Sequence, residues 1–151
     1  MSNASLEQLK KLRSVTQASI SDCRKALEES VGDYSKALLW LKEHGIEKAG
    51  KKADRETAQG LVDSYIHQNG KVGVLVSILC ETDFVARTSE FKSLVHEIAM
   101  QVAAMNPNDI DTLLKQEYIR DSSKTIESLV KEAIAKLGEN IVVKDFKRFD
   151  I

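Results

Sequence analysis

Hydrophobic residues recur at helical spacing in three stretches within the first 45 residues of the chain. Ser19 and Asp22 form a capping pattern at the start of the second stretch, and Asp33 can cap the third. Gly32 and Gly45 follow the second and third stretches, so we expect helices to end there. The three apolar faces are Leu6, Leu9 and Leu12, then Ile20, Cys23 and Leu27, then Tyr34, Ala37, Leu38 and Leu41. This pattern predicts a small bundle of three helices.

The hydrophobic period changes from helical to strand-like near residue 60. Residues 46–60 are rich in Lys, Ala and Gly and predict a linker with helical tendency. Residues 61–68 and 71–80 are strand-like, and Asn69-Gly70 lies between them. Because Asn-Gly tolerates positive φ at both positions, the pair predicts a hairpin closed by a type I′ turn.

The rest of the chain alternates between helical patterns and loops and ends in a strand. The expected elements are a loop over 81–88, a helix capped by Ser89 that reaches Met105 and is ended by Asn106-Pro107, and a short helix near 110–114. A helix over 126–137 closed by Gly138 and a strand over 141–151 follow. In the last strand Asp145 and Lys147 share a face with Val143 and Phe149, which predicts a bulge or an edge position. The fold class is therefore α+β: an N-terminal three-helix bundle, a linker, and a small antiparallel sheet packed with helices.

Composition narrows the range of partners. The 151 residues include 22 basic and 23 acidic side chains, so nothing indicates direct binding to nucleic acid. The one basic cluster, at Lys48, Lys51, Lys52 and Arg55, is better explained as a solvated linker. The longest apolar run, residues 72–80, is too short to cross a bilayer, and no signal peptide is evident. We expect a cytoplasmic protein without membrane contact, with Cys23 and Cys80 reduced and unpaired.

The sequence contains little that could support covalent catalysis. His44, His67 and His96 are scattered without metal-ligand spacing, so no metal or cofactor is expected. No glycine-rich phosphate loop is present. Cys80 lies next to Glu81 and near Asp83, whose charges would raise its thiol pKa and weaken it as a nucleophile. We expect no enzyme, and a thiol enzyme using Cys80 remains one alternative.

The segment from Thr82 to Arg87 is unusual because it places an aromatic residue in an expected loop, between an acid and a base. It reads Thr82-Asp83-Phe84-Val85-Ala86-Arg87. Phe84 could fold back onto the core, or it could be an exposed anchor for a partner. The pattern alone supports the two interpretations about equally.

Four motifs resemble those of the elongation factor Ts family, in the family's order and over nearly the whole chain. They are Cys80-Glu81-Thr82-Asp83-Phe84-Val85-Ala86-Arg87, which is similar to the signature TDFVA[RK]; Asp22-Cys23-Arg24-Lys25-Ala26-Leu27; residues 98–104 with Pro107; and Lys136-Leu137-Gly138-Glu139-Asn140-Ile141. Each motif is weak alone, but the signature together with the N-terminal block is specific.

The resemblance implies a fold, a function and a partner. Residues 1–50 would form a bundle like ubiquitin-associated domains, and residues 51–151 the family's core domain. The family releases GDP from elongation factor Tu (EF-Tu), binding its GDP-bound and nucleotide-free states. The resemblance implies that Asp83 and Phe84 enter between helices of the nucleotide domain, with Thr82, Val85, Ala86 and Arg87 completing the segment. Arg13, Ile20 and Ser21 of the bundle would face the same domain.

The chain also departs from the family. Gln17-Ala18-Ser19 replaces the family's usual Gly-Ala-Gly, which could change how the bundle grips its partner. Residues 113–118 resemble a longer segment of the family in shortened form, and the helical region that normally precedes that segment is missing. Because some short members pair through that part, we expect a monomer rather than a homodimer. A ubiquitin-associated-like adaptor is the second alternative, although an adaptor has no need of the segment from Thr82 to Arg87.

Overall fold

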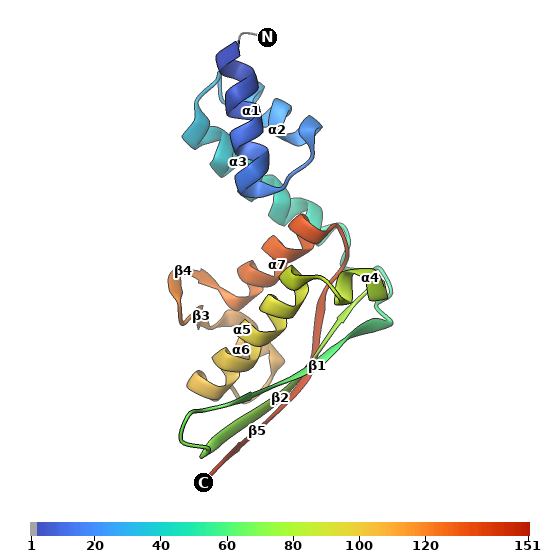
Figure 1. The fold of residues 1–151 in the computed structure, drawn as a ribbon, viewed down its shortest axis with the longest axis vertical. Helices are drawn as coiled ribbons and strands as arrows, with labels where there is room; N and C mark the ends of the chain where they lie inside the picture. The colour runs from blue at the N-terminus through green and yellow to red at the C-terminus, as the bar shows by residue number, and fades with distance from the viewer. Residues whose placement is uncertain (1–2) are drawn as a thin grey trace.

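The computed structural model describes residues 3–151, with side chains from residue 6 onward. A helical bundle lies at one end of an elongated molecule and a layer of helices on a sheet at the other (Figure 1). This arrangement confirms the predicted α+β class, with three N-terminal helices followed by a small antiparallel sheet.

The bundle consists of α1 (Asn3–Thr16), α2 (Ile20–Glu29) and α3 (Tyr34–Gly50). The expected caps are present: Ser19 accepts a hydrogen bond from the Asp22 amide, and Asp33 accepts one from the Lys36 amide. The predicted apolar faces meet in a separate hydrophobic cluster, in which Leu12, Cys23, Ala26 and Ala37 are fully buried. Cys23 and Cys80 are both free, as expected.

Helix α3 continues past Gly45 to Gly50, so the prediction that Gly45 ends it was wrong. The expected linker of helical tendency over residues 46–60 begins as the last turn of this helix and leaves it only at residue 51. Gly45 faces helix α7 (Ile126–Leu137), where an added Cβ would lie 3.1 Å from the Cβ of Ala135. The missing side chain lets the two helices approach closely. That packing offsets the helix cost of glycine, about 1 kcal/mol. Ala49, in the last turn of α3, packs into the hydrophobic core of the second half.

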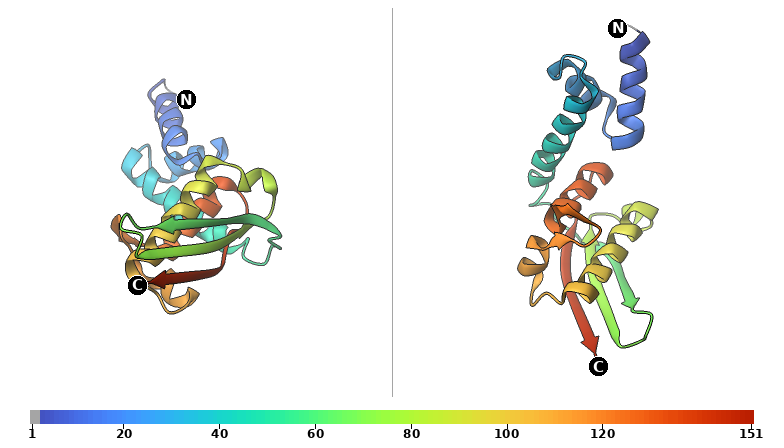
Figure 2. Two further views of the ribbon diagram at one scale, coloured as in Figure 1. Left: turned by 60° about the horizontal axis from the view of Figure 1, so that its bottom comes forward. Right: turned by 90° about the vertical axis from the view of Figure 1, so that its left-hand side faces the viewer.

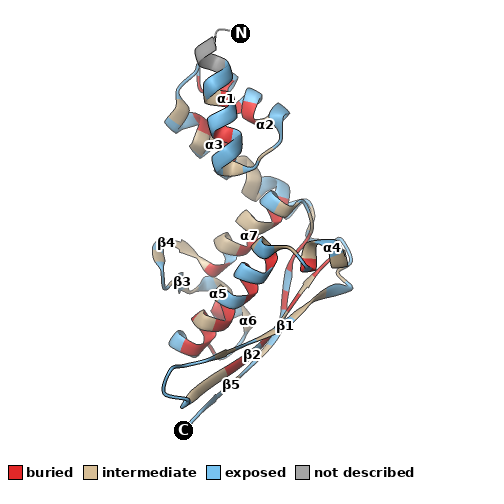
Figure 3. Cartoon of the chain, in the orientation of Figure 1, coloured by how far each residue is buried: buried red, intermediate tan, exposed pale blue. Residues whose placement is uncertain are grey.

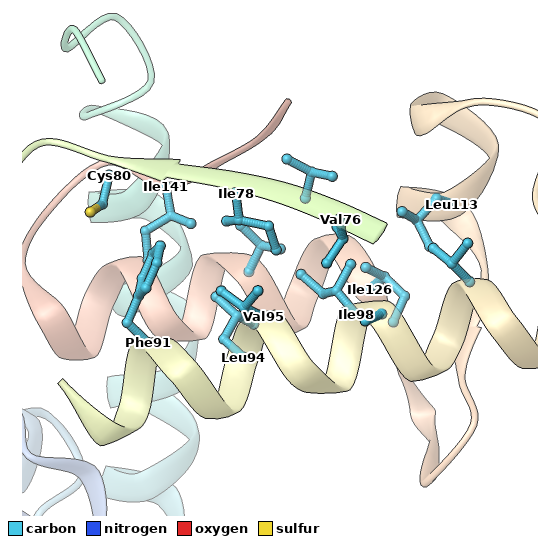
Figure 4. Close-up of a cluster of buried hydrophobic side chains, with 14 of the residues drawn as sticks. Val76, Ile78, Cys80, Phe91, Leu94, Val95, Ile98, Leu113, Ile126 and Ile141 are labelled. Carbon is cyan, nitrogen blue, oxygen red and sulfur yellow. The ribbon is translucent and has the colours of Figure 1, made fainter. Parts of the chain in front are cut away.

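The second half is built on a three-stranded antiparallel sheet. Its strands are β1 (Gln59–Ile66), β2 (Val72–Cys80) and β5 (Val142–Asp150), in the order β1-β2-β5. Helices α5 (Ser89–Met105) and α7 cover one face of it (Figures 1 and 2). The face of β2 that carries Val76, Ile78 and Cys80 points at these helices (Figure 4), and the cluster between sheet and helices is buried (Figure 3). Its fully buried members include Val76, Ile78, Cys80, Phe91, Val95, Ile98 and Ile126.

The predicted hairpin between β1 and β2 is confirmed, but its turn type is not. Of the two turn residues Asn69 and Gly70, only Gly70 has a positive φ (+69°), whereas a type I′ turn needs a positive φ at both. The Gly70 amide donates to the His67 carbonyl, and the Asn69 side chain accepts from the Lys71 amide. A four-residue turn over residues 67–70, whose last residue is the left-handed Gly70, replaces the two-residue turn, and the asparagine side chain stabilises this wider loop.

Strand β5 contains both features that its imperfect alternation predicted. It lies at an edge of the sheet, and its register against β2 shifts between Ser77 and Ile78. The shift leaves Val143 buried while Asp145, Lys147 and Phe149 are exposed. The bulge therefore lets a largely polar segment form a strand of which only one face contacts the core.

A short hairpin was not predicted. It follows α6 (Ile110–Lys115) and consists of β3 (Glu117–Tyr118) and β4 (Asp121–Thr125). The fully buried Gln101 of α5 holds it by donating to the Glu117 carbonyl at 3.0 Å and accepting from the Ile119 amide at 3.0 Å. A side chain distant in the sequence holds this hairpin, so the polar residues of the hairpin need no alternating strand pattern of their own.

Candidate partner-binding surface

The segment after β2 contains a one-turn helix rather than only a loop, which corrects the expectation for residues 81–88. Helix α4 spans Asp83–Ala86 and is capped by Thr82, whose hydroxyl accepts from the Val85 amide at 3.4 Å. We call residues 82–87 the α4 turn. Thr88 then caps α5, one residue before the expected Ser89. A turn this short has almost no helical stability of its own, so its neighbours must hold it.

The α4 turn separates its side chains into two groups. Ala86 is 4% exposed, and Val85 packs against the core. Phe84 is 78% exposed, so the interpretation that it folds back onto the core was wrong and the exposed interpretation holds. The ring of Phe84 thus projects into solvent from a turn whose opposite side packs against the core. Exposed phenylalanine is costly in water, and interfaces use such rings as anchors.

Charges of opposite sign flank the exposed ring. Arg87 donates to the Asp83 carboxylate at 2.8 Å, across one helical turn. Both side chains are well exposed, at 48% for Asp83 and 74% for Arg87. Surface pairs of this kind are worth little, so a partner can separate the two groups at small cost.

The base of the α4 turn is tied to a distant segment, the turn between α7 and β5. One carboxylate oxygen of Glu139 accepts from the amides of Glu81 (3.1 Å) and Thr82 (3.0 Å), and the other accepts from the Thr82 hydroxyl at 2.6 Å. In return, the Glu81 carboxylate accepts from the Asn140 amide at 2.7 Å. Glu139 and Asn140 had no predicted role. Their only signal was their place in the fourth motif.

Cys80 lies beneath the same turn and is fully buried, with its thiol 3.1 Å from the Thr82 carbonyl. Burial raises its pKa, and the nearby Glu139 carboxylate raises it further. The expected direction of the shift is confirmed, but its main cause is burial rather than the charges of Glu81 and Asp83. A buried thiol with a raised pKa is a poor nucleophile, which removes support for a thiol enzyme.

The bundle residues Arg13, Ile20 and Ser21 are exposed on either side of the connection between α1 and α2. Ile20 is 46% exposed, and the Ser21 hydroxyl lies 2.9 Å from that of Ser19. The structure does not bring these residues to the α4 turn, which belongs to the other half of the molecule. In Figure 1 both regions lie on the right-hand side. An open cleft of about 700 Å³ separates the connection from α7.

Within the described residues, no group of three or more His, Cys, Asp or Glu side chains is placed to hold a metal ion. In the same part of the chain, none of the helices is long and apolar enough to span a membrane.

Known proteins similar to this chain share one description. Residues 81–151 match the family described as Elongation factor TS. The elongation factor Ts of Rippkaea orientalis is 42% identical over 195 residues, covering 99% of this chain and 78% of the relative. That of Coprothermobacter proteolyticus is 43% identical over 188 residues, covering 95% of each. That of Nostoc sp. is 47% identical over 149 residues, covering 99% of this chain and 47% of the relative.

The first two alignments are longer than the 151 residues of this chain, so those relatives contain internal residues with no counterpart here. This agrees with the missing region inferred from the sequence. Identity above 40% over nearly the whole chain, with the signature segment inside the matched region, leads to one conclusion. The chain belongs to the elongation factor Ts family of translation elongation factors.

Proposed function

We propose that this protein is a guanine-nucleotide exchange factor that promotes release of GDP from EF-Tu. The observation that carries the proposal is Phe84, which stands 78% exposed on a fastened turn inside the family signature. Asp83 lies beside it with a carboxylate held only by an exposed ion pair. Together they present an apolar wedge and a negative charge to a partner.

The exchange mechanism depends on binding one state of the partner better than another. GDP with Mg²⁺ is held by charge-assisted bonds, and a factor accelerates release only if it favours the state in which those bonds are broken. An acceleration of about ten-thousandfold requires about 5.5 kcal/mol. Burial of one phenylalanine supplies roughly 2–3 kcal/mol. Phe84 therefore needs help from the rest of the interface.

The two groups of site residues have different tasks in this proposal. Phe84 enters between helices of the nucleotide domain, and Asp83 competes with the groups around Mg²⁺ and the β-phosphate. Arg13, Ile20 and Ser21 grip the same domain from the bundle and supply the additional binding energy. We assign these tasks to two domains, residues 1–50 and 51–151. The two separate hydrophobic clusters support two units, and Ala49 in the last turn of α3 packs into the second cluster.

The proposal requires no covalent chemistry and no bound cofactor, so the protein is not an enzyme in the chemical sense. Its partners are the GDP-bound and nucleotide-free states of EF-Tu. We place it where translation takes place, in the cytoplasm, although the family also includes a protein described as chloroplastic, from Guillardia theta.

The decisive experiment measures release of a fluorescent GDP analogue from EF-Tu in the presence of excess unlabelled GDP. We expect the release rate to rise with the concentration of this protein and then to saturate. Calorimetry should show no binding of GDP to this chain alone. Binding to EF-Tu without faster release would favour the adaptor alternative, and tight GDP binding by the chain itself would contradict the proposal.

A further inference from the structure

The turn between α7 and β5, residues 138–141, reaches across the molecule to the base of the α4 turn. Glu139 receives three hydrogen bonds there, from two backbone amides and one hydroxyl. The hydroxyl is that of Thr82, the residue that caps α4. A single carboxylate therefore fixes both the end of β2 and the cap of the helix that carries Phe84.

Asn140 extends the same connection to the linker that leads back to the bundle. Its side chain is 3% exposed and donates to the carbonyls of Arg55 (2.9 Å) and Ala53 (3.3 Å). The Arg55 guanidinium lies 3.6 Å from the Glu81 carboxylate, which also accepts from the Asn140 amide. Linker, α4 turn and α7–β5 turn thus meet in one network of partly buried hydrogen bonds.

We propose that Glu139 is a positioning residue for nucleotide exchange, which sets the direction of Phe84 by holding the Thr82 cap. The inference rests on the proposed function of the α4 turn. Phe84 itself is too exposed to be oriented by its own contacts, and a one-turn helix does not hold its shape alone. The orientation of the ring must therefore come from the base of the turn, which the charge-assisted bonds to Glu139 hold.

Misplacing a reacting or wedging group by about 1 Å can cost two orders of magnitude in rate. A positioning residue should therefore affect the maximal rate of GDP release more than the concentration of factor needed to reach half of it. The hydrogen bonds of Glu139 go to Glu81 and Thr82, so the bundle continues to bind the partner when the Phe84 ring is misaligned. A residue that serves only stability would not separate these two quantities once the protein is folded.

The test compares Glu139→Ala, Glu139→Gln and a control, Glu127→Ala. Glu127 lies in the first turn of α7, and its side chain, 53% exposed, pairs with Lys131 of that helix. We expect Glu139→Ala to lower the maximal GDP-release rate about tenfold or more, with a change of less than about threefold in the half-saturating concentration. Glu139→Gln should recover much of the rate, because an amide oxygen can still accept from both backbone amides. Glu127→Ala should match the wild type.

Two further measurements separate positioning from loss of fold. Circular dichroism and thermal unfolding establish the folded fraction of each variant, to which the rates are normalised. Amide hydrogen exchange should show lost protection at Glu81 and Thr82 in Glu139→Ala, with the sheet amides unchanged. In a Phe84→Leu background, which keeps part of the side chain, Glu139→Ala should have a much smaller effect than in the wild type.

The outcomes distinguish this inference from the proposed function. If the wild-type chain does not accelerate GDP release, both fall together. If the wild type accelerates release and Glu139→Ala does so equally well per folded molecule, only the positioning role is wrong. An effect of Glu139→Ala that is undiminished in the Phe84→Leu background would also overturn it.

Discussion

At the scale of single residues, Phe84 and its chemical surroundings decide what the α4 turn can do. Three of the four phenylalanines lie in contrasting places. Phe84 is 78% exposed on the α4 turn, Phe149 is 70% exposed on the outer face of the sheet, and Phe91 is fully buried in the core. Alanine substitution at each of the three positions therefore separates an effect on partner binding from an effect on the exposed sheet face and from an effect on core stability.

We predict that Phe84→Ala lowers GDP-release activity at least tenfold while changing the free energy of unfolding by less than about 0.5 kcal/mol. Truncation removes interface burial but costs the free protein little, because the ring makes few contacts. Phe149→Ala should leave both properties unchanged, and Phe91→Ala should cost about 3–5 kcal/mol of stability. Thermal unfolding and release kinetics on the same samples provide the comparison. A large loss of stability in Phe84→Ala with normal activity of the folded fraction would contradict the proposal that Phe84 enters between helices of the partner.

Asp83→Ala should also slow release, because it removes the charge placed to compete for Mg²⁺ and phosphate contacts. Asp83 and Phe84 are neighbours on one turn, so we expect the double variant to lose less than the sum of the two effects, expressed as free energies. Release kinetics in a complete mutant cycle measure the coupling. Strict additivity would indicate that the two side chains act at separate places on the partner.

At the scale of elements, an ion pair between α2 and α3 makes the bundle sensitive to acid. Lys48 of α3 donates to both oxygens of Asp22 at 2.7 and 2.8 Å. This bond from Lys48, opposed by burial and aided by Ser19, lowers the pKa of Asp22 from its ordinary value of 3.8. A depressed pKa stabilises the fold above the unfolded-state value, and that contribution is lost as the pH falls through the folded-state value.

We therefore predict that Lys48→Met lowers the melting temperature at pH 7, and that the difference from the wild type shrinks below about pH 4. Once Asp22 is protonated in both states, the lysine has no carboxylate to pair with. Thermal unfolding followed by circular dichroism between pH 7 and pH 2 measures the effect. Lys10→Met, on the exposed surface of α1, is a control for the loss of one positive charge. A difference that persists unchanged into acid would show that Lys48 acts through packing.

Local patterns predicted most elements because each has a consistent apolar face and a cap. Helices α5, α6 and α7 and the bundle all follow such patterns. Two of the failures share one cause. Gly45 lies inside α3 because it packs against Ala135, and the β3–β4 hairpin depends on Gln101, some fifteen residues earlier in the chain. Neither contact leaves a signal in the local sequence.

At the scale of the whole molecule, the outer face of the sheet is open. Val62, Ile66, Leu75 and Phe149 are at least half exposed on it. They are interspersed with Ser64, Ser77, Asp145 and Lys147. An antiparallel sheet can face water on one side, so the face is compatible with a single chain in solution.

We predicted a monomer from the shortened segment at residues 113–118, and a measurement of the molar mass in solution tests this prediction. Light scattering should give a mass near 16.8 kDa. A value of about twice that mass would contradict it. In that event, Leu75→Lys would place a charge at the centre of the open face, and recovery of the monomer would locate the contact there.

The fold class, the family and the segment that carries the candidate site could all be inferred from the amino-acid sequence alone. These are encoded in short-range periodicity, caps and motifs, which survive without knowledge of the fold. The tertiary structure decided that Phe84 points outward while Ala86 points inward. It also revealed that Glu139, 57 positions from Thr82, holds the base of the turn. Side-chain direction in a short turn is set by contacts between distant segments, and only the folded chain brings those segments together.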